Sequence, residues 1–390
     1  MKDMNMIYLD NSATTQLCKT AKEKMLEAME CYGNPSSKHK EGIEAKKLVD
    51  KARESVKRLF YMNGASPDKL IFTSCGTESN NMALYGGVYS KKRRVGDRII
   101  TTNSEHPSVD ATLKALEEDG FEVIRLKTQG GVLDFEEFKS YLNDRVILVS
   151  LMMVNNETGA VYDVAKFFSE AKKKNPDIIT HCDAVQGFLK IPFSPKKLCA
   201  DLISVSSHKI HGPKGVGGLY ISADIIKRRL ISPHMCGGGQ EGGLRSGTEN
   251  VIGICGFGGA CDEGYRNFRE SIEKMTMLRD LCRELATEAG ARVNLPAGQC
   301  APHIVSLTLP SIKSETMLNF LSSKNICVSA GSACSSHSKN ISSSLIGFGI
   351  SEKDADSTIR VSISEFNERE DIEEFSRALK EGIDSLVKIK

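Results

Sequence analysis

A lysine in a run of small and polar residues is the first candidate for chemistry in this chain. Lys209 lies beside His208 and shortly before the turn-forming pair Gly212-Pro213, in the run 206–215. A lysine held in a tight polar pocket can lose its proton and attack a carbonyl carbon. Taken alone, Lys209 is more typical of a surface lysine in a polar loop, so other motifs must decide between the two interpretations.

A second motif has the arrangement of an anion site. Gly76 and Thr77 follow a predicted strand that ends at Thr73, and they begin a predicted helix. In such a turn, free backbone N–H groups and the positive end of the helix dipole face the same point. Thr77 could instead serve only as the N-cap of the helix. From this motif alone, both interpretations stay open.

Three further polar residues follow predicted strand ends. His106 could act as a general base or lie against a planar cofactor, although a single histidine more often has a structural role. Asn156 could bind a ligand or form a turn. Asp183 needs a cation nearby if it is buried at a sheet edge, or else it caps a helix. Together with Lys209 and the anion site, these residues match pyridoxal phosphate, which needs a Schiff-base lysine and an acid for its ring nitrogen.

The elements that must position these residues alternate between strand and helix. Several of the strands are apolar on both faces, which predicts an α/β fold with a mostly parallel sheet buried between helices. In such sheets the functional residues collect beyond the strand ends. A smaller α+β domain is expected to follow. Predicted strands cover 70–73, 98–102, 121–126, 146–154 and 178–182, with others near 202, 220, 304 and 359; predicted helices cover 18–29, 37–61, 107–118, 135–142, 164–174, 251–279 and 371–387.

Length and composition are those of a globular protein with two domains, since the chain has 390 residues of which 40% are hydrophobic and 26% charged. A net charge of +2 does not indicate a nucleic-acid or membrane surface. The absence of a long apolar run and of a signal-peptide pattern predicts a cytoplasmic location. The twelve cysteines have no Cys-x-x-Cys spacing, which predicts reduced thiols and no metal site.

The motifs, taken in order, resemble those of a class V aminotransferase-fold enzyme, and within that group a cysteine desulfurase of the NifS/IscS type. The resemblance implies pyridoxal phosphate fold type I, with a large cofactor-binding domain over 16–262. A small domain of 1–15 and 263–390 would carry the catalytic cysteine loop at about 329–349. The matching segments span nearly the whole chain: 8–15, 33–37, 74–81, 105–106, 155–157, 183–186, 206–215, 245–248 and 331–334.

The resemblance also implies roles around the cofactor ring. Lys209 would form the Schiff base, and His106 would stack on the ring and carry protons. Asp183 would pair with the pyridinium nitrogen, and Gln186 would bind the ring hydroxyl. Asn156 is expected to contact both the cofactor and the substrate.

Further roles concern the phosphate and the substrate. Thr248 would reach the phosphate bound in the neighbouring subunit, which implies a homodimer. Arg360 and Asn156 would hold the carboxylate of the substrate L-cysteine, since arginine matches a carboxylate with two donors. Asn34 is also expected to bind the substrate. Within one subunit the phosphate would be held by Gly76, Thr77, Ser206 and His208.

Cys334 distinguishes a cysteine desulfurase from other class V enzymes. It lies in a small, polar stretch typical of a loop, and the run to Gly349 resembles the longer loop of the NifS/IscS branch. A thiolate there could take the sulfur of L-cysteine as a persulfide, leave L-alanine and pass the sulfur to an acceptor protein. That acceptor could be an iron–sulfur scaffold or an enzyme of tRNA or cofactor thiolation. Neither nucleic acid nor membrane is expected to bind directly.

Two alternatives and two departures from the family pattern remain. The chain could be another class V enzyme, an aminotransferase or a selenocysteine lyase, in which Cys334 is incidental. It could also be a sulfur-relay scaffold without enzymatic activity.

Gly242 stands where the family usually has arginine, and Glu365 stands at the arginine of the usual Gly-Arg-Phe. Either change could alter substrate affinity or partner docking.

Overall fold

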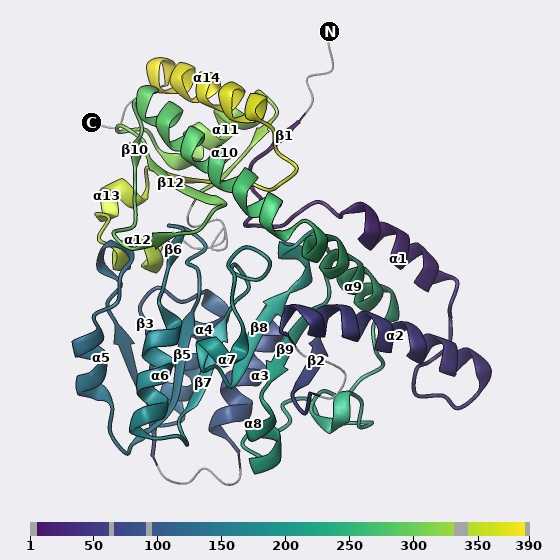
Figure 1. The fold of residues 1–390 in the computed structure, drawn as a ribbon. Coiled ribbons are helices and arrows are strands. Elements are labelled where there is room, and N and C mark those ends of the chain that lie inside the picture. The colour runs from purple at the N-terminus through teal and green to yellow at the C-terminus, as the bar shows by residue number, and fades with distance from the viewer. Residues whose placement is uncertain (1–5, 62–65, 91–95, 331–341, 387–390) are drawn as a thin grey trace.

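The fold is described by a computed structural model, which covers residues 6–61, 66–90, 96–330 and 342–386. A seven-stranded sheet has the order β2-β9-β8-β7-β5-β3-β4 (Figure 1). Only β9 runs antiparallel to its neighbours, which confirms the mostly parallel sheet. The strands are β2 (Lys69–Thr73), β3 (Arg98–Thr102), β4 (Glu122–Leu126), β5 (Val146–Met152), β7 (Ile179–Asp183), β8 (Leu202–Ser206) and β9 (Gly217–Ile221).

Both faces of this sheet are covered, as the continuous apolar strands predict. All seven residues of β5 are buried. In β2, Leu70 and Phe72 join one hydrophobic cluster and Ile71 joins another, because successive side chains of a strand point to opposite faces. The helices between these strands are α3 (Gly76–Val88), α4 (Pro107–Glu118), α5 (Phe135–Tyr141), α6 (Val164–Lys174) and α7 (Pro195–Leu198), and α8 (Ala223–Arg228) follows β9.

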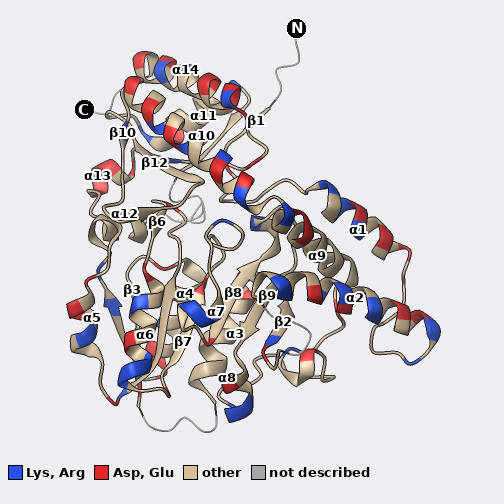
Figure 2. Ribbon diagram, in the orientation of Figure 1, with Lys and Arg blue, Asp and Glu red and all other residues tan. Residues whose placement is uncertain are grey.

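Two N-terminal helices, α1 (Lys19–Met29) and α2 (Lys40–Leu59), pack on α9 (Val251–Arg266) at one edge of the sheet (Figure 1). Glycines in α9 allow the close approach. A Cβ at Gly258 would lie 2.8 Å from the Cα of Ala52, and one at Gly259 would lie 2.7 Å from the carbonyl oxygen of Thr20. Basic and acidic residues alternate along the outer side of α2 (Figure 2), as in the pair Lys46–Asp50.

A second, antiparallel sheet has the order β10-β12-β15-β14 and its own hydrophobic core. We call this part the small unit and the part around the seven-stranded sheet the large unit. Leu9 belongs to the core of the small unit, since β1 pairs with β13. The boundaries at 15 and 262 stay a prediction. The elements are β1 (Ile7–Tyr8), α10 (Phe268–Glu288), β10 (Arg292–Val293), β12 (Ile304–Thr308), α11 (Ser314–Ser323), β13 (Ile326–Cys327), β14 (Ser329–Ala330), α12 (Ser343–Phe348), α13 (Glu352–Ala355), β15 (Thr358–Ser362) and α14 (Arg369–Ser385).

One of the predicted helices is divided into two helices in the structure. The chain over 251–279 breaks at Asn267, which ends α9 and precedes α10. A two-stranded pair of β6 (Ala160–Val161) and β11 (Gln299–Cys300) links the two units and was not predicted. Of the helices in the described ranges, none has the length and apolar character of a membrane span, and the described His, Cys, Asp and Glu residues form no group suited to a metal ion.

Candidate functional site

The candidate lysine lies directly after β8, in the short 3-10 turn η2 (Ser207–Lys209). Its Nζ donates to the carbonyl oxygens of Ser12 and Ala13 at 2.6 and 2.8 Å. The neighbouring His208 contacts the hydroxyl of Thr14 through Nδ1 at 3.2 Å. Lys209 is half-buried, and its amine is held against the segment that follows β1, so it is not a freely exposed lysine in a polar loop.

The anion site lies where β2 ends and α3 begins. Cys75, not Thr77, is the N-cap of α3, so the interpretation of Thr77 as a helix cap is wrong. A Cβ at Gly76 would lie 2.8 Å from Val185 and 3.3 Å from the Cβ of Ser206, so only glycine fits. The buried Oγ of Ser206 has no hydrogen-bond partner within the described chain. A helix N-terminus with an unsatisfied hydroxyl beside it suits a phosphate group.

His106 and Asp183 are joined by a network of polar side chains. Nδ1 of His106 accepts from the backbone N–H of Ser108 at 3.1 Å, so the neutral ring carries its proton on Nε2. Asn80 donates to Ser108 Oγ at 2.9 Å and to Asp183 Oδ2 at 2.7 Å. Asp183 also accepts from the N–H of Val185 at 2.9 Å. These two bonds fix the carboxylate at the end of β7.

The electrostatics place three of the candidate groups near one another. Burial lowers the pKa of His106, the charge of Asp183 opposes this shift and the charge of Lys209 adds to it. For His208, burial and then Lys209 lower the pKa to about 4. Asp183 and Lys209 therefore both act on His106 through space, as residues around a single ligand do.

Sequence reasoning missed His303, which fixes the orientation of Gln186. Gln186 donates through Nε2 to the carbonyl oxygen of Ser12 at 2.9 Å, so its Oε1 must face the ring of His303, 3.3 Å away. His303 is fully buried, and burial lowers its pKa well below the usual value. Its neutral ring therefore donates from Nε2 to Gln186. A single histidine before a strand gives no sequence signal for this contact.

Arg360 and Asn156 lie together on the small-unit side. Arg360 in β15 is 5% exposed, bonds Asp10 at 2.9 Å and donates to the backbone carbonyl of Asn156 at 3.0 Å. Its Nε has no partner among the described residues. A buried guanidinium with an unused donor suits a carboxylate.

Two other candidate residues, Asn34 and Thr248, have no contact with this cluster in the described part of the chain. Asn34 is exposed on the loop between α1 and α2, and its Oδ1 accepts from the N–H of Ser36. Thr248 is exposed in the loop before α9. Cys334 lies outside the described residues.

Fold and site together define a class of protein. The chain belongs to the aminotransferase class-V family, whose model matches residues 7–375. Enzymes of this family use pyridoxal phosphate. Gly76, the Ser206 hydroxyl that has no partner among the described residues, the anchored Asp183 and the half-buried Lys209 fit that cofactor's phosphate, ring nitrogen and aldehyde.

Similar proteins of known function narrow the class of enzyme within this family. The chain is 36% identical over 387 residues to a cysteine desulfurase of Trichormus azollae, covering 98% of this chain and 94% of that protein. It is 39% identical over 379 residues to cysteine desulfurase IscS of Salmonella paratyphi C (strain RKS4594), covering 94% and 90%. A solved NifS-like protein superimposes with a TM-score of 0.89 at 36% identity, covering 98% of this chain and all of the other. These relatives support a cysteine desulfurase function.

Proposed function

We propose that the protein converts L-cysteine to L-alanine and holds the released sulfur as a persulfide on Cys334. The observation that carries the proposal is the hydrogen-bond network that joins His106 to Asp183, together with the packing of the Gly76 turn against Ser206, which directly precedes the turn of Lys209. Pyridoxal phosphate, when bound, supplies the electron sink that makes the substrate carbon reactive.

The described side chains would bind and orient the reactants. Gly76 and Ser206 would hold the phosphate, with Thr77 and His208 beside them, while Gln186 would present its second amide hydrogen to the ring hydroxyl. Asp183 would keep the ring nitrogen protonated. Arg360 would orient the substrate carboxylate, and Asn156 and Asn34 would complete the substrate site.

Two groups would move protons during the reaction. His106 is neutral and carries its proton on Nε2, so that atom can donate and later recover it. Lys209 Nζ would hold the cofactor and then exchange protons with the substrate carbon.

In the sulfur-transfer step, the thiol of Cys334 would accept the sulfur of the substrate. Its thiolate forms an S–S bond to the substrate sulfur while the carbon–sulfur bond breaks. The electron pair of the broken bond stays with the carbon fragment, which takes up a proton and leaves as L-alanine. Cys334 keeps the sulfur as a persulfide, which an acceptor thiolate can attack.

The test is the stoichiometry of the products. With L-cysteine and dithiothreitol, we expect equal amounts of alanine and sulfide from the wild type, and neither from Cys334→Ser. Lys209→Ala should lack the near-visible absorbance that borohydride removes from the wild type. Steady transamination without sulfide would favour the aminotransferase alternative, and a protein without cofactor absorbance would favour a scaffold.

We further infer that the enzyme is a homodimer that passes sulfur to a partner protein. The run from Met235 to Gly239 is exposed, as is Thr248, and the segment between them is tied to its own chain by the Arg53–Glu241 and Arg245–Glu78 ion pairs. A fixed, exposed loop of this kind suits a subunit interface. The acceptor would be an iron–sulfur scaffold or a thiolation enzyme, and transfer of labelled sulfur from Cys334 to proteins captured from the native cell would identify it.

A further inference from the structure

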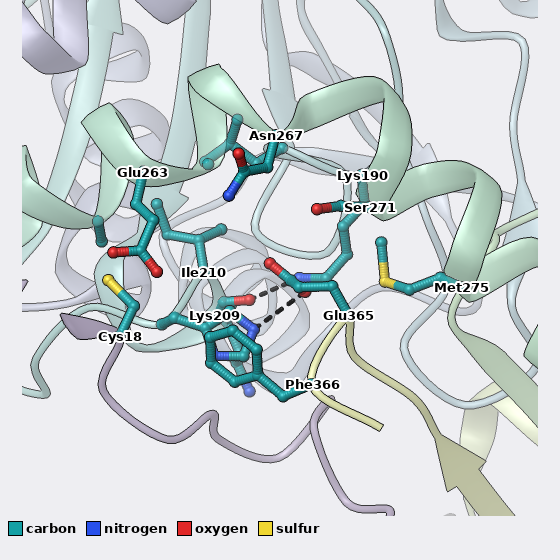
Figure 3. Close-up of a pocket in the computed structure, with 14 residues that line it drawn as sticks. Cys18, Lys190, Lys209, Ile210, Glu263, Asn267, Ser271, Met275, Glu365 and Phe366 are labelled. Carbon is teal, nitrogen blue, oxygen red and sulfur yellow. Dashed lines mark hydrogen bonds and ion pairs between the residues drawn. The ribbon is translucent and has the colours of Figure 1, made fainter. Parts of the chain in front are cut away.

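A small cavity lies between the turn that carries Lys209 and the junction of α9 and α10 (Figure 3). Its volume is about 40 Å³, and the residues around it include Lys190, His211, Asn267 and Glu365. Lys190 is 6% exposed, and its Nζ donates to the main-chain carbonyl of Lys209 at 2.5 Å. A buried ammonium group therefore holds the backbone of the lysine turn.

Glu365 approaches the same turn from the loop after β15. Its Oε2 lies 3.2 Å from Nε2 of His211, whose Nδ1 faces the carbonyl oxygen of Gln16 at 2.8 Å. Phe366 covers the ring of His211, with centroids 4.4 Å apart. Lys274 in turn donates to the carbonyl oxygen of Glu365 at 2.9 Å. The loop of the small unit is thus fastened to a residue two positions after Lys209.

The charges of these groups depend on one another. Burial lowers the pKa of Lys190 to about 8, and the charge of Glu365 opposes that shift. Burial alone would raise the pKa of Glu365, but its bond to His211, with the charges of His211 and Lys190, outweighs burial and lowers it. A buried cation needs a compensating anion, and Glu365 is the acidic group that acts on Lys190.

We propose that Glu365 is a positioning residue for Lys209: it holds the ring of His211 and balances the charge of Lys190, and so fixes the turn that presents the cofactor lysine. The proposal rests on the role proposed above for Lys209. It gives a purpose to the acidic residue that departs from the family pattern at this position. It also makes the geometry of Lys209 depend on a loop of the small unit.

The test compares cofactor binding in three variants. Glu365→Gln keeps the shape and removes the charge, while Glu365→Arg replaces the carboxylate near Lys190 by a second cation. Glu368→Gln is the matched control, because Glu368 lies in the same loop and pairs with Lys274 but does not contact the lysine turn in the described structure. The measurements are the dissociation constant for pyridoxal phosphate, followed by absorbance, and the melting temperature with and without the cofactor.

We expect roughly tenfold weaker cofactor binding in Glu365→Gln, the size of effect that losing a hydrogen bond to a charged group produces. Glu365→Arg should weaken it by roughly a further tenfold, because like charges oppose one another in a buried site. The rise in melting temperature that the cofactor gives should shrink in both variants. Glu368→Gln should bind like the wild type.

A purely structural role would give a different result. Equal losses of melting temperature with and without cofactor, at an unchanged dissociation constant, would overturn the proposal. A wild type that binds no pyridoxal phosphate would refute the proposed function itself, and the inference with it. Normal wild-type binding with unaffected variants would refute the inference alone.

A double-mutant cycle covers the case in which the arginine variant does not fold. Lys190→Met removes the cation that Glu365 balances and keeps a side chain of similar length. Glu365→Gln should then weaken cofactor binding less in the Lys190→Met background than in the wild type, because the two residues act together. Fully additive losses would show that they act independently, which would overturn the proposal.

Discussion

At the scale of single residues, the site depends on buried polar groups whose charge is set by their surroundings. Glu105, next to His106, is the clearest case. It is fully buried, and its Oε1 accepts from Thr102 Oγ1 at 2.8 Å and from the N–H of Met152 at 3.0 Å. Burial raises the pKa of Glu105 from 4.5 to about 8, and the charge of Asp183 adds to the shift. The folded protein therefore holds this carboxyl group neutral near pH 7.

Replacing Glu105 by glutamine should change how stability depends on pH. In the wild type, the stability contributed by the neutral carboxyl is complete below about pH 4.5 and is lost as the pH rises through about 8. The amide of Glu105→Gln keeps the two accepted bonds and does not ionise. We expect the variant to gain stability relative to the wild type between pH 5 and 8, on the order of 3 kcal/mol. Urea denaturation at several pH values measures this.

An exposed glutamate provides the control for that experiment. Glu23 on α1 has a side chain that is 59% exposed, so Glu23→Gln should follow the wild-type curve. Parallel curves for the wild type and Glu105→Gln would mean that Glu105 is already ionised in the folded protein.

Arg360 carries a second prediction at this scale. Its guanidinium can meet a carboxylate with two donors, whereas a lysine at the same place offers only a point charge. For Arg360→Lys we expect a fall in kcat/KM for L-cysteine of about a hundredfold, mostly through KM, since a charged pair at such a site contributes a few kcal/mol. Steady-state kinetics of alanine formation would measure it. Arg292→Lys is the control, because Arg292 pairs with Asp354 on the exposed side of the small unit; a similar loss in both variants would contradict the assignment.

At the scale of elements, α12 shows how a helix cap is tied to a buried acid. Ser342 Oγ accepts from the N–H of Leu345 as the N-cap, and it donates to Glu157 Oε2 at 2.6 Å. Burial raises the pKa of Glu157 to about 7, and the bond from Ser342 is the main opposing influence. One hydroxyl therefore satisfies the helix end and the loop after β5.

Removing the Ser342 hydroxyl should lower the free energy of unfolding by more than removing an ordinary helix cap does. Ser351→Ala removes the cap of α13 alone and should cost about 1 kcal/mol. Ser342→Ala also leaves the Glu157 oxygen without its donor, so we expect a loss of roughly 2–3 kcal/mol and faster hydrogen exchange in 343–348. Denaturant unfolding and hydrogen exchange would measure both effects. Equal costs for the two variants would mean that the bond to Glu157 adds nothing.

The local sequence pattern predicts those elements whose structure is set by their own residues. The apolar run of β5 predicts a strand buried on both faces, and the glycine turn at Gly76 predicts the start of α3. Short strands such as β11 depend on a partner far along the chain, so local pattern cannot reveal them. The same holds for His303, whose function comes only from its distance to Gln186. Asn80 lay within a matched motif, but its link between Ser108 and Asp183 needed the fold.

At the scale of the whole molecule, each half of the site depends on the other unit. Arg360 and Glu365 come from the small unit, and they contact Asn156 and His211, which belong to the large unit. The proposed third contribution, Thr248 from a second subunit, extends this dependence to the dimer. Met235 lies near the other end of the same loop and bridges to Arg245, and it is 43% exposed.

A charge at Met235 should therefore separate the subunits and weaken cofactor binding together. We expect the wild type to have about twice the mass of the 42.7 kDa chain in solution and Met235→Glu to shift towards the single chain. Burying a carboxylate in an apolar interface costs several kcal/mol, enough to dissociate most dimers at micromolar concentration.

Met277→Glu on α10 is the control, because Met277 is 63% exposed and belongs to the other unit. Light scattering gives the mass, and cofactor absorbance gives the binding. If Met235→Glu stayed dimeric with full cofactor binding, this loop would not form the interface; if it became monomeric and still bound the cofactor normally, Thr248 would not reach the phosphate of a neighbouring subunit.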